Sequence, residues 1–428
     1  MISPSPKAAR STSSGGRVGK IDGIASPAAQ LLRAAAVRER SARLLGLAER
    51  DALAHFAFSP QRLPDAARYV LDTIRARYPD LAIPFHSRWR HFTAGGVGRW
   101  AQLADEIGGV DPAERARIRF DLALTSVLLD AGAGDRWRYR EKGGAEYGRS
   151  EGLAVASLHL FRAGAFSGSA RASLRADAAG LGALDLAKLA DGLQVAASNP
   201  LPGLEGRLGL LHRLGTALAS EQSLFGPDAR FGNLFDYLIA ESAGGAIAAP
   251  RILELLLHGL GGIWPGRLSL EGVPLGDTWR HRALQTDDPT SGYMPLHKLS
   301  QWLVYSLIEP IEETGACVTE IDGLTGLAEY RNGGLMIDTG VIEPRDPRLA
   351  TERLSVGDEA VVEWRALTVA LLDRLADAVR LSLGLSAEAL PLARVLEGGT
   401  WAAGRRIALE RRPGGVSPLA IESDGTVF

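Results

Sequence analysis

The sequence has almost no cysteine, since Cys317 is the single thiol among 428 residues. One thiol cannot form an intramolecular disulfide, and no Cys or His spacing typical of structural zinc surrounds it. Long apolar runs are also missing, because no stretch approaches the roughly 20 residues that span a bilayer. The N-terminus lacks the apolar segment of a secretory signal peptide. We therefore expect a cytoplasmic protein without a membrane partner.

A surplus of one charge sign is absent as well. The chain carries 48 Lys and Arg against 50 Asp and Glu, a formal net charge of -2 at pH 7. Proteins that bind nucleic acid normally carry a basic surface, so the sequence predicts no nucleic-acid partner. Hydrophobic residues make up 46% of the chain, which is enough to bury a sizeable core.

Several catalytic motifs do not occur. The sequence contains no HExxH, GxSxG, CxxC or GxxxxGK[ST] pattern. It also lacks a strand, GxGxxG and helix in the order that a dinucleotide site requires. Metalloprotease, serine hydrolase, thiol-redox and NTPase functions lose support, and we expect neither a metal ion nor another cofactor.

The chain reads as one mainly α unit behind a short tail. Residues 1–25 are rich in Ser, Gly and basic residues and carry few large apolar groups, which predicts a disordered tail. From Ser26 and Pro27 onward, apolar residues recur at helical spacing. Asp111 precedes another helix with the spacing of a capping box. With no linker or repeat after the tail, the sequence predicts a single large helical domain over 26–428.

Strand patterns are few and short. Asn332-Gly333-Gly334 can form a tight turn, and an apolar run rich in Leu and Ile follows it. A second pattern places Gly143-Gly144 between WRYRE and AEYGRS. The sequence therefore predicts small β-hairpin elements within the helical domain.

Four segments concentrate reactive residues, and the first is IPFHSRWRHFTAGGVGRW. It contains His86, Arg88, Arg90 and His91 among aromatic residues. Guanidinium groups beside aromatic planes can hold a phosphate and stack a planar group. The alternative is a structural loop whose Arg and Trp side chains pack on one another.

The second and third segments surround two helix ends. An apolar helix stops at Asp130 before a Gly-Ala-Gly run, which either exposes backbone amides to an anion or simply caps the helix. In GYMPLHKLSQWLVYSLIEP, helical spacing places His297, Gln301 and Tyr305 on one face, with Lys298 beside the first. That polar stripe either lines a cavity or faces solvent.

The fourth segment, IDGLTGLAEYRNGG, holds Asp322, Glu329, Tyr330 and Arg331 around two glycine-containing turns. A carboxylate near an anomeric carbon can stabilise an oxocarbenium ion or activate a water molecule, as cleavage of an N-glycosidic bond requires. A surface Glu–Arg pair of little energetic value is the alternative.

Six segments in order resemble the signature blocks of the URC/Urg family of uracil catabolism, which has been described as a domain of unknown function. They are PFHSRWRHFTAGGVGRW, LLDAGAGDRWRYRE, SEGLAVASLHLF, GYMPLHKLSQWLVYSLIEP, GLTGLAEYRNGGL and RRPGGVSPLAIESDGTVF. The resemblance implies a pathway in which uracil becomes a ribose phosphate, a relative of GTP cyclohydrolase II opens the ring, and urea is released.

The order of segments also resembles queuosine 5′-phosphate N-glycosidases, which are helical proteins related to DNA glycosylases. The similar stretches are EGLAVASLHLFRA, LPGLEGRLGLL, the helix start at Lys298 and the segment ending at Arg331. This resemblance implies a helical DNA-glycosylase-like fold, a catalytic carboxylate at Glu329 and a 5′-phosphate ligand at Lys298. Glu329 stands where that family has Asp, and Asn332-Gly333-Gly334 replaces its Val-Pro-Gln.

Together these observations favour a metal-independent N-glycoside hydrolase that releases urea, or a ureido group, from a ribosylurea-type 5′-phosphate. Glu329 is the candidate general base or electrostatic stabiliser, and Asp130 or Asp322 would orient ribose or water. The small-molecule phosphorylated ribosyl substrate would be bound by residues of all four segments. The candidates are His86, Arg88, Arg90, His91, His297, Lys298, Gln301, Tyr330 and Arg331.

Two other functions remain open from the sequence. A uracil phosphoribosyltransferase fits the pathway, although the sequence shows no convincing strand-loop motif with adjacent acids that would hold diphosphate and Mg²⁺. A non-catalytic nucleotide-binding protein would need the same clustered residues but no carboxylate near the glycosidic carbon.

Overall fold

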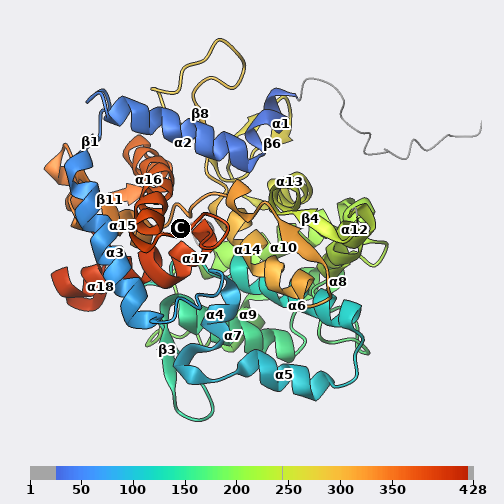
Figure 1. Ribbon diagram of the computed structural model, residues 1–428. Helices are drawn as coiled ribbons and strands as arrows, with labels where there is room; N and C mark the ends of the chain where they lie inside the picture. Colours follow the sequence, from blue (N-terminus) through green and yellow to red (C-terminus); the bar gives the residue numbers. More distant parts are fainter. Residues whose placement is uncertain (1–25, 243, 423–428) are drawn as a thin grey trace, which may run out of the picture.

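The computed structural model describes residues 26–242 and 244–422, and the predicted tail, residues 1–25, lies outside them. Most of this part of the chain is helical, and strands form only short pairs (Figure 1). The predicted mainly α class is therefore confirmed. None of the helices described combines the length and apolar composition that a membrane crossing needs.

Helices and strands alternate irregularly along the described residues. The helices are α1 (Pro27–Leu31), α2 (Ala34–Ala48), α3 (Leu63–Arg77), α4 (Arg88–Phe92), α5 (Arg99–Ile107), α6 (Pro112–Leu128), α7 (Arg149–Arg162), α8 (Ala178–Ala183), α9 (Leu186–Gly192), α10 (Leu204–Ser220), α11 (Gln222–Phe225), α12 (Leu234–Glu241), α13 (Ala249–Leu260), α14 (Lys298–Glu312), α15 (Tyr330–Asp338), α16 (Glu359–Leu383), α17 (Leu392–Val395) and α18 (Trp401–Arg411). The strands are β1 (Phe56–Phe58), β2 (Arg138–Arg140), β3 (Glu146–Gly148), β4 (Ala246–Ala248), β5 (Ser269–Leu270), β6 (Val273–Pro274), β7 (Thr278–Arg280), β8 (Tyr293–Pro295), β9 (Cys317–Thr319), β10 (Ile342–Pro344), β11 (Arg353–Ser355) and β12 (Ala420–Glu422).

Side-chain caps fix two of the predicted helix starts. The Ser26 hydroxyl accepts a hydrogen bond of 3.2 Å from the N–H of Ala29, and Pro27 occupies the first position of α1. The Asp111 carboxylate accepts one of 3.0 Å from the N–H of Glu114 at the start of α6. Each cap satisfies a backbone donor that has no partner within its own helix.

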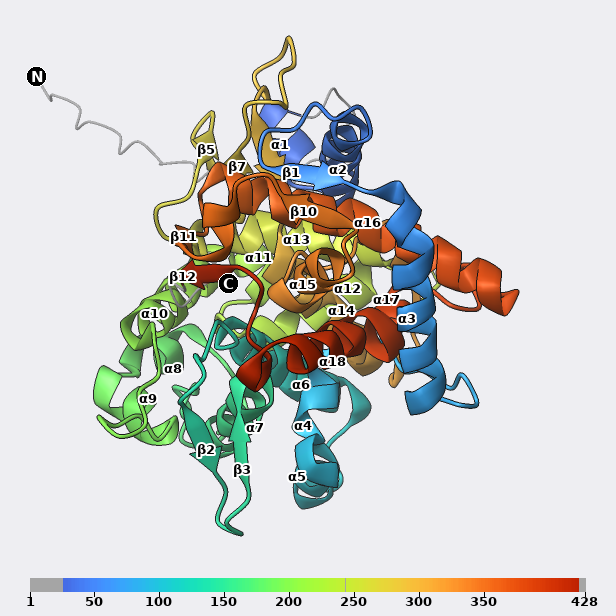
Figure 2. The ribbon, with the colours of Figure 1, turned by 90° about the vertical axis from the view of Figure 1, so that its left-hand side faces the viewer.

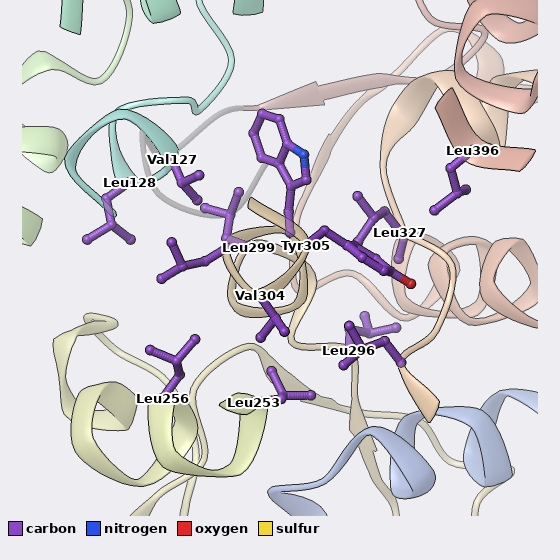
Figure 3. Packing of buried hydrophobic residues seen from close by; sticks show 14 of the residues in the cluster. Val127, Leu128, Leu253, Leu256, Leu296, Leu299, Val304, Tyr305, Leu327 and Leu396 are labelled. Carbon is purple, nitrogen blue, oxygen red and sulfur yellow. The ribbon is translucent and has the colours of Figure 1, made fainter. Parts of the chain in front are cut away.

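Helix α14 forms the centre of the core. Its Leu299 and Val304 belong to the same hydrophobic cluster as Val127 of α6 and Leu253 and Leu256 of α13 (Figure 3). Most of its side chains are buried, on every face. A helix that is buried all round cannot turn or slide without losing packing, so it holds its polar side chains in fixed positions.

Glycines bring α15 close to its neighbours. This helix packs between α16 and α18 (Figure 2). Gly333 lies against the indole of Trp364, whose Nε1 donates a hydrogen bond of 3.0 Å to the Gly333 carbonyl. A Cβ atom on Gly404 of α18 would clash with the backbone oxygen of Arg331. Both contacts require a residue without a side chain.

One of the two predicted hairpins is confirmed, and the other is wrong. Strands β2 and β3 pair antiparallel around Gly143-Gly144. The run Asn332-Gly333-Gly334, which the sequence suggested as a hairpin turn, lies inside helix α15. The Glu329 carboxylate caps this helix by accepting the N–H groups of Arg331 and Asn332, so the chain starts a helix there. The glycines serve helix packing.

Candidate functional site

Helix α4 directs a buried cation toward the centre of the molecule. The Arg88 side chain has 0% exposure. Its Nε donates to the Ser126 hydroxyl at 2.6 Å, and its Nη1 lies 3.0 Å from Oδ2 of Asp130. Burial lowers the pKa of Arg88, and Asp130 opposes that shift. A buried guanidinium needs such a partner to offset its lost hydration.

Asp130 connects the end of α6 with the start of α7. Its Oδ2 accepts a hydrogen bond of 2.6 Å from the Ser150 hydroxyl, in addition to the contact with Arg88. Asp130 therefore positions the Arg88 guanidinium from one side.

Helix α14 faces α4 with a stripe that contains Lys298, Trp302 and Ser306. The Ser306 hydroxyl accepts a hydrogen bond of 2.9 Å from the N–H of Arg88. The Arg88 guanidinium carbon lies 5.3 Å from the centre of the Trp302 ring. Burial and the positive charge of Arg365 lower the pKa of Lys298, whereas Glu329 and Asp130 act in the opposite direction. Lys298 thus lies within electrostatic reach of both carboxylates.

Helices α15 and α18 contribute a second buried cation, Arg331, and the ring of Trp401. Arg331 is 4% exposed, and its guanidinium carbon lies 4.2 Å from the centre of the Trp401 ring. Burial alone would lower the pKa of Arg331, but Tyr330, Glu151 and Glu329 raise it above its ordinary value. Arg331 therefore remains a cation in a water-poor environment.

His91 lies near the rings of Trp302 and Trp401. Its ring centre is 5.5 Å from that of Trp302 and 5.5 Å from that of Trp401. Burial lowers the pKa of His91 well below its usual value, and the charges of Arg88 and Arg331 act in the same direction. Because Nη1 of Arg88 donates to Nδ1 of His91 at 3.2 Å, the neutral ring carries its proton on Nε2.

These interactions connect residues from all four of the segments in which the sequence concentrates reactive residues. Arg88 contacts both Asp130 and His91. The other links are electrostatic: the charges of Asp130 and Glu329 act on Lys298, and those of Arg331 and Glu329 act on His91 and Arg331, respectively. We call this set, together with Trp302, the central cluster. Glu329 is its half-buried carboxylate, held in place by backbone N–H groups at 2.6 and 2.9 Å.

A rim of charged residues borders the central cluster. Glu151, 19% exposed in its side chain, pairs with Arg405, and the charges of Arg331 and Arg405 lower the pKa of Glu151 against the effect of burial. A cavity of about 10 Å³ opens here, lined in part by Tyr330, Arg331 and Gly404. It has room for roughly one water molecule, so a larger ligand requires rim side chains to move.

His86, which precedes α4, lies beside the central cluster and contacts the π-helical segment Leu396–Thr400. Its Nδ1 lies 2.8 Å from a carboxylate oxygen of Glu397, and its ring stacks on Trp302 with ring centres 6.1 Å apart. Burial would raise the pKa of Glu397, but the hydrogen bond to His86 and the charges of Arg77 and Arg90 keep it below its ordinary value. His86 therefore supports the position of the Trp302 ring.

The structure places the other candidates outside the central cluster. Asp322 accepts hydrogen bonds of 2.7 Å from Arg380 and from the N–H of Leu392. Arg90 forms a two-oxygen ion pair with Glu309 at 2.6 and 2.8 Å. We leave Asp322 and Arg90 out of the proposed site for this reason.

His297 and Gln301 also serve packing. Nε2 of His297 lies 2.9 Å from the carbonyl of Leu31. Gln301 exchanges hydrogen bonds with the backbone and hydroxyl of Thr325, at 2.8 and 2.7 Å. The stripe at His297 and Gln301 therefore holds the Thr325 loop, and the neighbouring stripe at Lys298 and Trp302 faces the cluster.

Sequence reasoning missed Trp302, Trp401 and Glu151. Trp302 could have been found, because it lies four residues after Lys298 and so shares its helix face. Glu151 lies in the first turn of α7, in a segment that the sequence analysis used only for its resemblance. Trp401 has no local signal. Among the described residues, no three His, Cys, Asp or Glu side chains gather in a way that suits a metal ion.

Comparisons with known proteins agree over nearly the whole chain. Residues 30–428, which include the central cluster, match the family described as "Protein of unknown function (DUF1688)". The chain is similar to "Protein urg3" of Schizosaccharomyces pombe, at 42% identity over 411 residues that cover 94% of this chain and 98% of that protein. It is also similar to "Uracil catabolism protein 4" of Lachancea kluyveri, at 37% identity over 407 residues that cover 87% and 92% of the two chains.

Proposed function

This chain belongs to the DUF1688 family, the URC/Urg family of uracil catabolism, and from that premise we propose that it is an N-glycoside hydrolase of a ring-opened pyrimidine nucleotide. The substrate would be a ribosylurea-type 5′-phosphate. The observation that supports this proposal is the central cluster, in which one half-buried carboxylate, Glu329, stands among buried cations.

The proposed reaction replaces a carbon–nitrogen bond with a carbon–oxygen bond. The bond between C1 of ribose and the urea nitrogen breaks, and urea leaves with the bonding electron pair. Water adds its oxygen to C1, and its proton ends on the leaving nitrogen. The products are ribose 5-phosphate and urea, and the transition state resembles an oxocarbenium ion.

Glu329 suits the positive charge that develops at C1. Each of its carboxylate oxygens accepts one backbone hydrogen bond, which leaves further lone pairs for substrate or water. These bonds fix the carboxylate before the reaction begins, so it needs little reorganisation in the transition state. Asp130 would act on the substrate through the Arg88 guanidinium that it positions.

The test is to mix the purified full-length protein with phosphoribosylurea and to measure urea. We expect wild type to release urea, and Glu329→Gln to lower kcat by about 10²-fold or more. No release by wild type, or undiminished release by the variant, would contradict the hydrolase proposal.

A second helix cap supplies the matched control, because Glu329→Gln also weakens the cap of α15. Asp111→Asn changes the capping carboxylate of α6. We expect each change to lower stability by no more than about 1 kcal/mol, while only the Glu329 variant loses urea release. Equal loss of activity in both variants would indicate general destabilisation.

Two further assays address the two other functions. Tight binding of ribose 5-phosphate without any urea release would favour a nucleotide-binding pathway protein. Uracil-dependent consumption of phosphoribosyl diphosphate would instead favour a phosphoribosyltransferase.

A further inference from the structure

Four hydrogen-bond donors of the central cluster are buried and meet no acceptor within the described residues. They are Nη2 of Arg88, Nε1 of Trp302, and Nη1 and Nη2 of Arg331. Buried polar atoms are nearly always paired in folded proteins, and leaving them unpaired costs stability. Such a group of donors therefore calls for a ligand that supplies acceptors.

These donors lie around His91. The Arg88 guanidinium carbon is 5.3 Å from the Trp302 ring centre, and that of Arg331 is 4.2 Å from the Trp401 ring centre. The His91 ring centre is 5.5 Å from both ring centres, and the charges of both guanidinium groups act on His91.

His91 adds a fifth donor. Its Nδ1 accepts the hydrogen bond from Arg88, so the neutral ring presents an N–H at Nε2. The nearest carboxylates have other partners, because Asp130 contacts Arg88 and Ser150, and Glu151 pairs with Arg405. Glu329, the carboxylate within the central cluster, accepts the backbone N–H groups of Arg331 and Asn332, so none of these acids accepts a hydrogen bond from the four unpaired donors.

We infer that Arg88, Arg331, Trp302 and His91 bind the 5′-phosphate of the substrate as a dianion. A phosphate monoester has three terminal oxygens, which can accept all of these donors, and guanidinium groups bind two oxygens at once. The inference rests on the proposed ribosyl 5′-phosphate substrate. This assignment also sets the orientation of the substrate. With the phosphate at these donors, C1 of the ribose would lie toward Lys298 and Glu329.

Ligand binding without turnover tests the site. Isothermal titration calorimetry of the full-length protein with ribose 5-phosphate, inorganic phosphate and ribose would separate the contribution of the phosphate group to binding from that of the sugar. We expect ribose 5-phosphate to bind, inorganic phosphate to compete with it, and ribose to bind at least about 100-fold more weakly, since hydrogen bonds to charged groups are strong. Ribose binding as tightly as ribose 5-phosphate, or no binding of either, would overturn the inference.

Two variants identify the donors. Trp302→Phe keeps an aromatic ring and removes one N–H, so we expect about tenfold weaker binding of ribose 5-phosphate. Arg331→Met replaces the guanidinium with an uncharged side chain, and we expect the affinity for ribose 5-phosphate to fall about 100-fold. Arg90→Met is the matched control on the same helix as Arg88, with an unchanged affinity expected. If Trp302→Phe and Arg331→Met bind as wild type does, the donors are not the phosphate site.

Failure of this inference can be told apart from failure of the hydrolase proposal. Binding that depends on Trp302 and Arg331, without urea release, keeps the phosphate site and removes the proposed reaction. Urea release with an unchanged KM in both variants keeps the reaction and removes the phosphate site. Thermal melting of each variant checks that it is folded.

Discussion

Arg88 and His91 lie one helical turn apart on α4, and Nη1 of Arg88 donates a hydrogen bond of 3.2 Å to Nδ1 of His91. If His91 became protonated, its positive charge would face that of the Arg88 guanidinium. Arg331, Arg405 and His86 also face His91, and burial and these neighbours hold its pKa well below the usual range. In the proposed phosphate site, His91 would therefore act as a neutral N–H donor.

The first prediction concerns the pH dependence of ribose 5-phosphate binding. The second ionisation of a phosphate monoester has a pKa of about 6, so affinity should rise as pH increases through that value and then stay level to about pH 8. A His91 that titrated near its ordinary pKa would add positive charge at low pH, and affinity would fall as pH rises. Calorimetry across this range decides the sign. His91→Gln, which keeps a donor, should show the same profile.

The second prediction separates Lys298 from the phosphate site. Lys298→Met should lower kcat for urea release by about 10²-fold and leave the affinity for ribose 5-phosphate within about threefold of wild type, because the ammonium charge interacts with the charges of Glu329 and Asp130, at the end of the site proposed for C1. Burial lowers the pKa of Lys298, so activity should decline with rising pH before the ordinary lysine pKa is reached. An unchanged kcat with a raised KM would instead indicate that Lys298 binds the 5′-phosphate, as the sequence predicted.

The third prediction uses two helical glycines. Gly404→Ala places a methyl group against the backbone oxygen of Arg331, so it should lower the free energy of unfolding by about 1–3 kcal/mol and weaken ribose 5-phosphate binding by displacing Arg331. Gly182→Ala, in α8, meets nothing within 4 Å and should raise stability by up to about 1 kcal/mol. Urea denaturation of both variants provides the comparison. A Gly404 variant as stable as wild type would show that α18 moves away without cost.

Local signals predicted much of the fold. Ser26 and Asp111 cap helices where the sequence placed them, because a capping side chain acts on a backbone group three residues away. Asn332-Gly333-Gly334 misled the prediction, because glycine is equally typical of turns and of close helix packing. The residue that requires glycine at 333 is Trp364, which lies 31 positions away and leaves no local trace.

The candidate site was predicted in part, for a similar reason. Sequence spacing grouped His297 with Gln301, and the same i, i+4 spacing, which the prediction did not use, relates Lys298 to Trp302. Only the packing of α14 shows which of these faces meets α4 and which meets the Thr325 loop. Residue type and helical period specify a stripe, and the neighbouring helices decide what that stripe contacts.

The last prediction concerns the buried ion pair behind Lys298. Asp277 is 2% exposed and accepts hydrogen bonds of 3.0 and 2.8 Å from Arg365 and one of 3.0 Å from the N–H of Lys298. Asp277→Asn leaves the Arg365 charge buried without its partner, which should cost about 3–5 kcal/mol. The exposed pair of Asp65 and Arg68 is the control, and Asp65→Asn should change stability by less than about 1 kcal/mol.

Asp277 should also make stability depend on pH. Burial would raise its pKa, but Arg365 and the hydrogen bonds hold it well below the ordinary value. Because the unfolded chain has an Asp pKa of about 3.9, the folded protein binds fewer protons near that pH, and stability falls as pH decreases through it. Urea denaturation at about pH 7 and at about pH 4 should show a smaller loss in Asp277→Asn than in wild type. Equal losses would mean that other carboxylates govern acid unfolding.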